Sequence, residues 1–373
     1  MKKHKKFIEL VNCYPYPIPM KEEEDYFLLP AKVMRKKGFE CEFVTLRAQG
    51  DRTIETKFAN DKAALEHFRG FPIRRFDKTL SLLNYIRKEK ALLHANLRPF
   101  LPTTLSSLLP NTKVIRPFTY YMGSNFAIAL GSAVLFRRFD RILAVTPYEC
   151  GVYRKYLIPE KKITHIPLAI DYKFFSKKAK ADGVRKKFGI KQSDKVIVAV
   201  ANVRKLKRFD VLLKALTIVR KSVPTAKVVI VGTDMLHAQG LPSLKETSAK
   251  LGISDSVVVT GFQPAEVLRK IYSISDVFVH PAADEYQGLV SYEASAMGIP
   301  LCLSTIGSHT SVYGGHALYH EVNDFKKLAE NIVTCINKRE SRAEHIKFLK
   351  NHMKNWDYPV IAKRLSSFYD ELI

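Results

Sequence analysis

Several features that often decide the class of a protein are scarce or missing here. The five cysteines are scattered and form no Cys-x-x-Cys pair, which argues against a disulfide framework or a structural zinc site and favours a reducing compartment. No apolar run reaches the ~20 residues that a membrane-spanning helix needs. The basic start leads into Phe7–Asn12, an apolar run interrupted by Glu9, so we expect a first β-strand rather than a signal peptide. We therefore expect a cytoplasmic protein.

What the chain does contain points to a well-packed protein with anionic partners. Its 373 residues suggest two domains at ~150 residues each, and 46% hydrophobic residues exclude intrinsic disorder. The net charge of +25 favours phosphate-bearing partners such as nucleotides, nucleic acid or an anionic membrane surface. No nucleic-acid motif and no dedicated basic arm accompany that charge, so we expect no nucleic-acid partner.

Strand-like runs alternate with helix-like runs along the whole chain. The expected strands are Phe7–Asn12, Cys41–Leu46, Ala91–Asn96, Lys113–Thr119, Ile142–Thr146, Val196–Asn202, Lys227–Gly232, Ser256–Gly261, Asp276–Pro281 and Pro300–Ser304. The expected helices are Asp25–Lys37, Lys78–Lys90, Ser124–Phe139, Asp210–Val223, Leu241–Leu251, Pro264–Ser273 and Leu289–Met297. Such alternation is typical of parallel sheets covered by helices on both faces. It predicts an α/β protein with two doubly wound, Rossmann-like domains facing each other across a cleft.

The domain boundary is expected where a strand-like run gives way to the polar, lysine-rich segment that begins at Asp171. This places an N-terminal domain at residues 1–168 and a C-terminal domain at residues 169–355. Residues 356–373 form an amphipathic pattern with no strand after it. We expect this last helix to pack back onto the first domain.

Ligands of doubly wound domains bind at the carboxyl ends of the strands, so the segments just after each strand are the candidates for a site. The turn after Val196–Asn202 carries several cations, among them Arg204 and Lys207, and then opens a helix. Cations at a helix N-terminus suit a diphosphate. A solvated basic turn is the alternative interpretation.

The segment after Asp276–Pro281 carries two glutamates at a spacing that chance alone also produces. Glu285 falls in the expected loop, Gly288 permits close backbone approach at a helix N-terminus, and Glu293 falls on the second helical turn. A carboxylate accepts hydrogen bonds from two neighbouring hydroxyls, so this pair suits a sugar and a ribose.

Together these segments resemble the C-terminal half of retaining glycosyltransferases of family 4, a group with the two-domain glycosyltransferase-B fold. The resemblance rests on Val198–Leu216, Val228–Gly232, Val257–Phe262 and Asp276–Gly298. It also rests on the Glu-x7-Glu spacing and on Glu293–Pro300, which follows the pattern Glu-Ala-x-Ala-x-Gly-x-Pro. The match is specific over about residues 140–373 and only architectural before that.

The resemblance implies that residues 1–168 form the acceptor-binding domain and residues 169–355 the nucleotide-sugar-binding domain. It also implies roles for individual residues. Glu285 would contact hydroxyls of the donor sugar, Glu293 the nucleotide ribose, and Arg204 with Lys207 the donor diphosphate. The remaining contacts would come from backbone near the helix start and the base pocket, at Gly288, Leu289, Gly232 and Phe262.

The sequence also departs from the family. Tyr286 and Gln287 stand where the family has small or aromatic residues, and Tyr14–Pro19 replaces its glycine-rich first loop. The family's histidine in the first domain would fall near Thr119–Tyr121, where this chain has none. The acceptor or auxiliary candidates that remain are His94, Tyr120 and Tyr121.

The implied activity is metal-independent transfer of a sugar, with retention, from a nucleoside-diphosphate sugar to a glycan or lipid-linked glycan. No Asp-x-Asp occurs, so we expect no metal and no cofactor. Basic residues lie beside apolar ones in the first domain, at Lys2–Lys6, Arg74–Phe76, Arg137–Phe139 and Arg154–Tyr156. They indicate either a buried helix over Ser124–Phe139 with basic, solvated turns, or a face that rests on an anionic membrane surface at the inner face of the membrane. The alternatives left open are a sugar-nucleotide epimerase or hydrolase on the same fold, a non-catalytic nucleotide-binding subunit, and a nucleic-acid binder.

Overall fold

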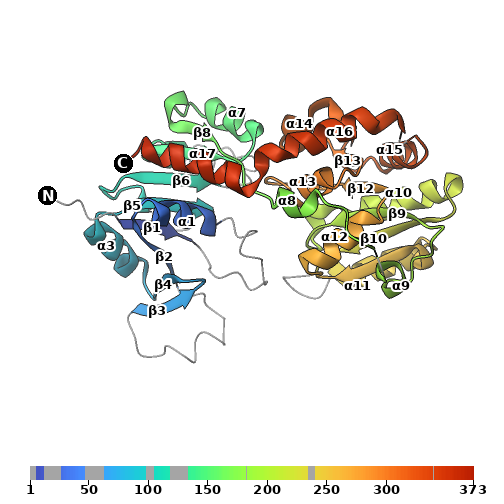
Figure 1. Ribbon diagram of the computed structural model, residues 1–373, viewed down its shortest axis with the longest axis horizontal. Coiled ribbons are helices and arrows are strands. Elements are labelled where there is room, and N and C mark those ends of the chain that lie inside the picture. The colour runs from blue at the N-terminus through green and yellow to red at the C-terminus, as the bar shows by residue number, and fades with distance from the viewer. Residues whose placement is uncertain are drawn as a thin grey trace. The chain divides into compact units, whose positions relative to one another are not determined.

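The chain divides into two compact units in a computed structural model that describes residues 6–11, 27–46, 63–97, 105–117, 133–181, 183–233, 240–338 and 340–373. The first unit comprises Met1–Ala169 together with Tyr358–Ile373, and the second comprises Ile170–Asp357 (Figure 1). The predicted second domain starts at residue 169, next to the observed change of unit between Ala169 and Ile170. The predicted last helix starts at residue 356, two residues before the segment Tyr358–Ile373 that belongs to the first unit.

The first unit is built on an eight-stranded sheet in the order β3-β4-β2-β1-β5-β6-β7-β8. Its strands are β1 (Lys6–Leu10), β2 (Glu40–Leu46), β3 (Ala63–Phe68), β4 (Phe71–Phe76), β5 (Leu92–Leu97), β6 (Lys113–Pro117), β7 (Arg141–Ala144) and β8 (Ile163–His165). All neighbouring strands are parallel except β3 and β4. The longer helices are α1 (Leu28–Lys36), α3 (Thr79–Glu89), α7 (Pro147–Lys155) and α17 (Tyr358–Asp370).

The C-terminal helix α17 belongs to the first unit although it follows the second in sequence. Its apolar face buries Ile361, Leu365, Phe368 and Tyr369 in the same core cluster as Phe7 of β1. Residues three and four apart lie on one face of a helix, so this spacing yields a continuous apolar stripe.

The second unit has a six-stranded parallel sheet in the order β11-β10-β9-β12-β13-β14, which is the doubly wound order 3-2-1-4-5-6. Its strands are β9 (Lys195–Val200), β10 (Ala226–Val231), β11 (Val257–Gly261), β12 (Val277–His280), β13 (Leu301–Ser304) and β14 (Leu318–His320). Its helices are α8 (Tyr172–Phe175), α9 (Val184–Lys187), α10 (Phe209–Ser222), α11 (Gly240–Lys250), α12 (Ala265–Ser273), α13 (Leu289–Ala296), α14 (Gly307–Tyr313), α15 (Phe325–Asn337) and α16 (Ala343–His352). The predicted α/β class with two doubly wound domains is confirmed.

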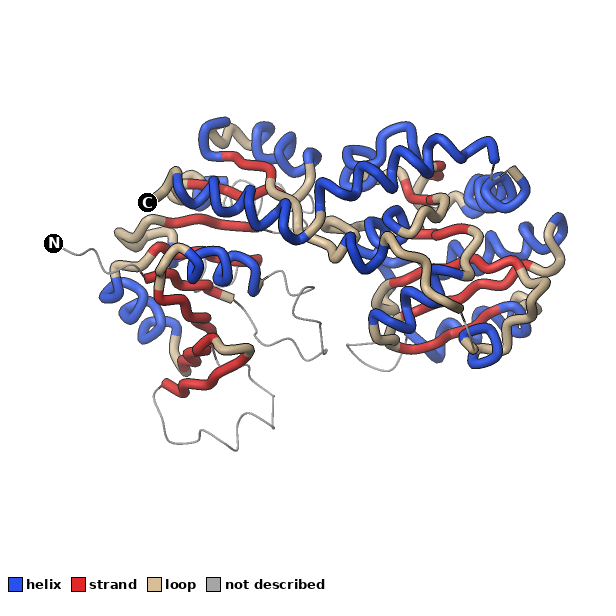
Figure 2. The backbone as a smooth tube through the Cα atoms, in the orientation of Figure 1, coloured by secondary structure: helices blue, strands red, loops and turns tan. Residues whose placement is uncertain are grey.

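The apolar strands of this sheet are buried on both faces. Along β9, Val196 and Val198 join one core cluster, whereas Ile197 and Ala199 join another. Successive side chains of a strand point to opposite faces, and both faces are covered by helices, so the strand is apolar throughout (Figure 2). This arrangement leaves the strand ends as the places where polar side chains gather.

The hairpin of β3 and β4 was not among the predicted strands. Arg69 and Gly70 connect the two strands, and both have positive φ, at 50° and 75°. A two-residue connection with positive φ at both positions matches the twist of antiparallel strands. It adds an antiparallel edge to an otherwise parallel sheet.

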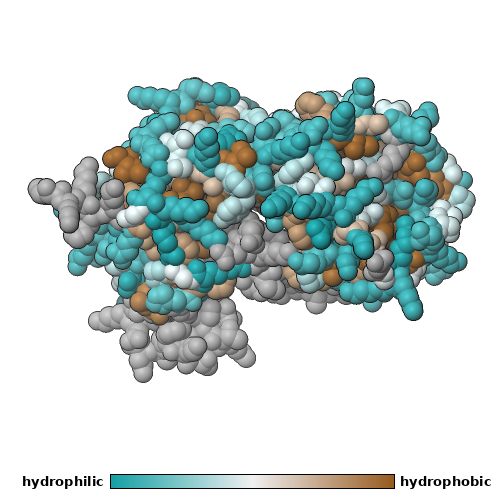
Figure 3. Space-filling view, viewed as in Figure 1, coloured by the Kyte–Doolittle hydropathy of each residue, from teal (hydrophilic) through white to brown (hydrophobic). Residues whose placement is uncertain are grey.

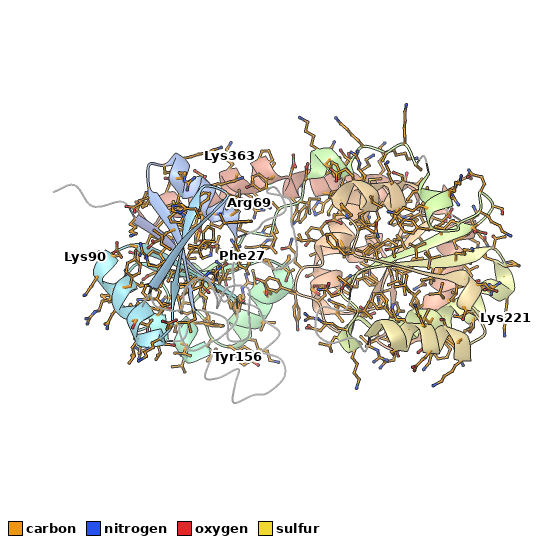
Figure 4. The ribbon with its side chains drawn as sticks, turned by 90° about the horizontal axis from the view of Figure 1, so that it is seen from below. Phe27, Arg69, Lys90, Tyr156, Lys221 and Lys363 are labelled. Atoms are coloured by element: carbon orange, nitrogen blue, oxygen red, sulfur yellow. The ribbon has the colours of Figure 1, made fainter. Side chains whose placement is uncertain are left out.

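The surface of the described residues is largely hydrophilic on the face drawn in Figure 3. Figure 4 shows Lys90 and Lys221 extending outward, while Phe27 lies in the interior of the first unit. Across the described ranges, no helix has the length and apolarity required to traverse a membrane.

Candidate active site

The candidate site of the second unit lies where its strand order reverses. Strands β9 and β12 are neighbours there, and their following connections run in opposite directions along the sheet. Ligands of open α/β sheets bind outside the carboxyl ends of the strands at such a point. The loop after β9 carries Lys207 and the loop after β12 carries Glu285. The backbone ties these loops together, because Ala283 N–H donates to the Leu206 carbonyl at 2.8 Å.

The loop after β9 ends in a short 3-10 turn, Lys205–Lys207, before α10 begins at Phe209. Arg208 connects the two with a positive φ of 50°, and its guanidinium pairs with Asp210 at 2.8 Å. The side chain of Lys207 is only 18% exposed. Its ammonium is therefore held at the strand end instead of extending into solvent.

The loop after β12 turns into α13 at Gly288. This glycine has a φ of 70°, and a Cβ there would come within 3.1 Å of the Glu285 Cγ. Glycine thus permits both the left-handed turn and the close approach of Glu285 to the start of α13. Leu289, the first helical residue, is partly buried against the core.

Glu285 is the centre of this arrangement. Lys207 Nζ donates to its Oε2 at 2.7 Å, His280 Nε2 lies 3.2 Å from the same oxygen, and the Tyr286 amide donates to Oε1 at 2.9 Å. Burial raises the pKa of Glu285, but the Lys207 charge and the His280 contact outweigh it and hold that pKa well below its ordinary value. Burial and the neighbouring charge of Glu285 raise the pKa of Asp284. A fixed carboxylate charge beside a cation is the result.

Glu293 lies on the second turn of α13. The hydroxyl of the fully buried Tyr272 donates to its Oε2 at 3.1 Å. The glutamate is half-buried, and the Tyr272 hydroxyl holds one oxygen of its carboxylate.

The structure does not bring every predicted residue into this cluster. Arg204 is exposed, and within the described ranges no hydrogen bond or ion pair joins its side chain to Lys207 or Glu285. Gly232 and Phe262 follow the neighbouring strands β10 and β11, where Gly232 N–H donates to the Gly261 carbonyl at 3.0 Å. Phe262 is 44% exposed beside that turn. The roles of these residues stay predictions.

His94 lies inside β5 of the first unit, within the predicted strand Ala91–Asn96. It is fully buried, with its Nδ1 2.9 Å from the Tyr369 hydroxyl and 3.2 Å from Glu9 Oε2. Asn96 donates to the other oxygen of Glu9. These contacts give His94 a role in joining α17 to the sheet, and its auxiliary role stays a prediction. Tyr120 and Tyr121 lie outside the described residues, as does Tyr14–Pro19.

The sequence interpretation missed His280 and Tyr272, although each contacts a predicted glutamate. The available signal for His280 was its place as the last residue of an apolar strand, directly before the candidate loop. In the described segments, no group of three or more His, Cys, Asp or Glu residues is placed to hold a metal ion.

The comparisons with solved structures establish the fold. The chain is similar over 99% of its length to 99% of a sucrose-phosphate synthase from Thermosynechococcus elongatus, with a TM-score of 0.75 and 16% identity. It is also similar over 99% of its length to all of Anabaena HepE in complex with UDP-glucose, with a TM-score of 0.78 and 14% identity. The protein has the glycosyltransferase-B fold.

The sequence comparisons find a family match within the second unit. Residues 181–352 match the family model described as glycosyl transferases group 1. The D-inositol 3-phosphate glycosyltransferase of Segniliparus rotundus is 30% identical over 48% of this chain and 40% of its own length. The mannosylfructose-phosphate synthase of Agrobacterium fabrum is 29% identical over 52% and 44%. The chain therefore spans less than half the length of these two relatives.

Proposed function

We propose that this chain is a glycosyltransferase that moves a sugar from a nucleoside-diphosphate sugar to a hydroxyl acceptor. The observation that carries the proposal is the Lys207–Glu285 pair at the switch point of a unit that matches the model of group 1 glycosyl transferases. One structural neighbour is a complex with UDP-glucose, and one relative is a mannosylfructose-phosphate synthase, which supports a nucleotide-sugar donor.

The geometry supports different roles for the two loops: the loop after β9 would bind the diphosphate, and the loop after β12 would bind the sugar. When the sugar leaves, negative charge develops on the diphosphate, and Lys207 with the N-terminus of α13 is aimed at that end of the sheet. Glu285 offers a buried, charged acceptor for sugar hydroxyls, and Glu293 offers one for the ribose. Metal-independent transfer with retention remains part of the proposal. Arg204 would be a second cation for the diphosphate, and the nucleotide base would bind near Gly232 and Phe262.

Nucleoside-diphosphate binding tests the proposal directly. We expect UDP or another nucleoside diphosphate to bind in the presence of a chelator, and Lys207→Ala to weaken that binding by about 1.5–3 kcal/mol, the contribution of a charge-assisted hydrogen bond. Arg204→Ala should weaken it as well, through the same attraction. Titration calorimetry with and without chelator measures both effects, and Lys221→Ala, an exposed lysine of α10, is the control. Chelator-sensitive binding, or binding indifferent to Lys207, would contradict the proposal.

We also propose that the first unit rests on an anionic membrane and reaches a lipid-linked acceptor. Arg74 and Arg75 are excluded from such a surface, because Arg74 pairs with Glu42 and Arg75 is buried. Arg154 is engaged by Glu160 through two hydrogen bonds of 2.6 and 2.7 Å.

Another basic and apolar patch supports this proposal better. Leu157 is 75% exposed, and its carbonyl accepts from the Arg137 guanidinium at 2.8 Å. Val134 is 53% exposed one helical turn before Arg138, and Lys155 is exposed beside Leu157. Exposed apolar side chains flanked by exposed cations suit a surface of anionic lipid headgroups.

Vesicle co-sedimentation tests the membrane proposal. Each cation near an anionic surface contributes about 1 kcal/mol, so we expect binding to phosphatidylserine vesicles at low salt that is lost as salt rises. The double variant Arg138→Glu, Lys155→Glu should lose this binding, whereas Lys221→Glu should retain it. Absence of vesicle binding by the wild type at low salt, with activity on a soluble acceptor, would refute the membrane proposal.

A further inference from the structure

Two buried histidines lie behind Glu285, and no role for them follows from the proposed function as stated. His280 is the last residue of β12 and is 2% exposed, and His309 on α14 is completely buried. Their ring centroids are 5.2 Å apart. The pair connects two neighbouring strand ends to the carboxylate that we assign to the donor sugar.

The tautomer of His309 follows from its partner. Its Nδ1 lies 3.0 Å from the Ser304 carbonyl oxygen, which can only accept, so Nδ1 carries the proton. Burial and the neighbouring His280 lower the pKa of His309 to about 3. His309 is therefore neutral at physiological pH, and it adds no charge beside His280.

His280 faces Glu285 directly. Its Nε2 lies 3.2 Å from Glu285 Oε2, close enough to donate a hydrogen bond to that oxygen after a small rotation, although among the described residues neither ring nitrogen has an aligned hydrogen-bond partner. The charged and titratable groups facing His280 are Glu285, Lys207 and His309. Burial lowers the pKa of His280 and the contact with Glu285 opposes that shift. A neutral imidazole here adjoins the carboxylate without cancelling its charge.

We propose that His280, supported by His309, is a positioning residue that keeps Glu285 in place while Lys207 turns to the donor diphosphate. The inference rests on the proposed function, in which Lys207 serves the diphosphate and Glu285 the sugar. In the free chain both Lys207 and His280 approach Oε2, and the Tyr286 amide holds Oε1. When the diphosphate draws the Lys207 ammonium away, His280 is the contact that remains on Oε2.

The need for such a contact follows from burial. The Glu285 side chain is 16% exposed, and a carboxylate that loses a charged partner in such surroundings tends to rotate or take up a proton. Either change would remove the acceptor that the sugar hydroxyls require. A histidine anchored to the strand end prevents the rotation because its own ring is packed against His309.

The variants His280→Leu and His280→Gln test the proposal in the full chain. We expect His280→Leu to lower kcat with the best nucleotide-sugar donor by about 10- to 100-fold, the effect of losing a hydrogen bond to a charged group. The Kd for the nucleoside diphosphate should stay unchanged, because Lys207 is intact. His280→Gln should recover most of the rate, since its amide nitrogen can occupy the position of Nε2.

A matched control comes from the same sheet. His320 is the last residue of β14 and is also 2% exposed, but its Nδ1 is bound to the Glu321 carbonyl and not to Glu285. His320→Leu should leave kcat unchanged, with thermal melting used to compare the folding of all three variants. Equal losses of kcat in His280→Leu and His320→Leu, or an unchanged kcat in His280→Leu, would overturn the positioning role. A wild type that neither binds nor uses any nucleotide sugar would instead refute the proposed function.

Discussion

Replacing Glu285 by glutamine is expected to reduce sugar transfer by on the order of 10²-fold or more, as the loss of a preorganised electrostatic contact does. Glutamine keeps the size of the side chain but removes its charge, and its amide group would face Lys207 Nζ or the Tyr286 amide with a donor in place of an acceptor. The affinity for the nucleoside diphosphate should change far less, because Lys207 and the backbone at Gly288 remain.

Steady-state kinetics with a nucleotide sugar, together with circular dichroism and thermal melting, measure this effect. Glu246→Gln makes the same chemical change on the exposed face of α11 and should transfer at the wild-type rate. Transfer by a folded Glu285→Gln variant at that same rate would contradict the role of Glu285, and the contact with Lys207 would then be a structural ion pair only.

The location of the site was predictable because it depends on strand order and local motifs. Apolar runs followed by polar loops identified β9 and β12, and both loops were expected to bind ligand before their contact was known. A doubly wound sheet makes these two strands neighbours at its switch point. The topology therefore brings Lys207 and Glu285 together although they are 78 positions apart along the chain.

The contacts that fix Glu285 were less accessible from the sequence. His280 contacts Glu285 across a tight loop, and His309 reaches the pair from α14, so both depend on the backbone path rather than on a periodic pattern. Arg204 is exposed within the described structure, and its role as a second cation for the diphosphate stays a prediction.

The first unit was harder to predict for a different reason. Its β3–β4 hairpin lacks the usual Asn-Gly or Asp-Gly signal and uses Arg69-Gly70 instead. The buried contacts of His94 come from Glu9 and Tyr369, and the hydroxyl of Tyr369 belongs to a helix 275 residues later. Such long-range polar contacts leave no local pattern.

Replacing Gly232 by alanine is expected to destabilise the second unit by about 3 kcal/mol or more, among the larger effects of single substitutions. Gly232 has a φ of 150°, and a Cβ there would lie 1.9 Å from the Ala201 carbonyl oxygen. Real Cβ atoms do not approach backbone so closely, and neither group is the end of a flexible side chain. The ends of β9 and β10 must therefore separate, which strains the hydrogen bond from Ala201 N–H to the Val231 carbonyl.

The control for this variant separates the clash from the backbone conformation. Gly252 also has a positive φ, at 65°, but a Cβ there would meet nothing within 4 Å. Gly252→Ala should cost only about 1–2 kcal/mol, the usual penalty of left-handed backbone for alanine. Each kcal/mol corresponds to about 2–4 °C in Tm for a unit of this size, so differential scanning calorimetry resolves the two variants.

Because Ala201 leads into the loop that carries Lys207, Gly232→Ala should also weaken nucleoside-diphosphate binding in the fraction that remains folded. Equal melting temperatures for the two variants would show that the strand ends accommodate the methyl group, and the close approach at Gly232 would then not be what fixes the Lys207 loop.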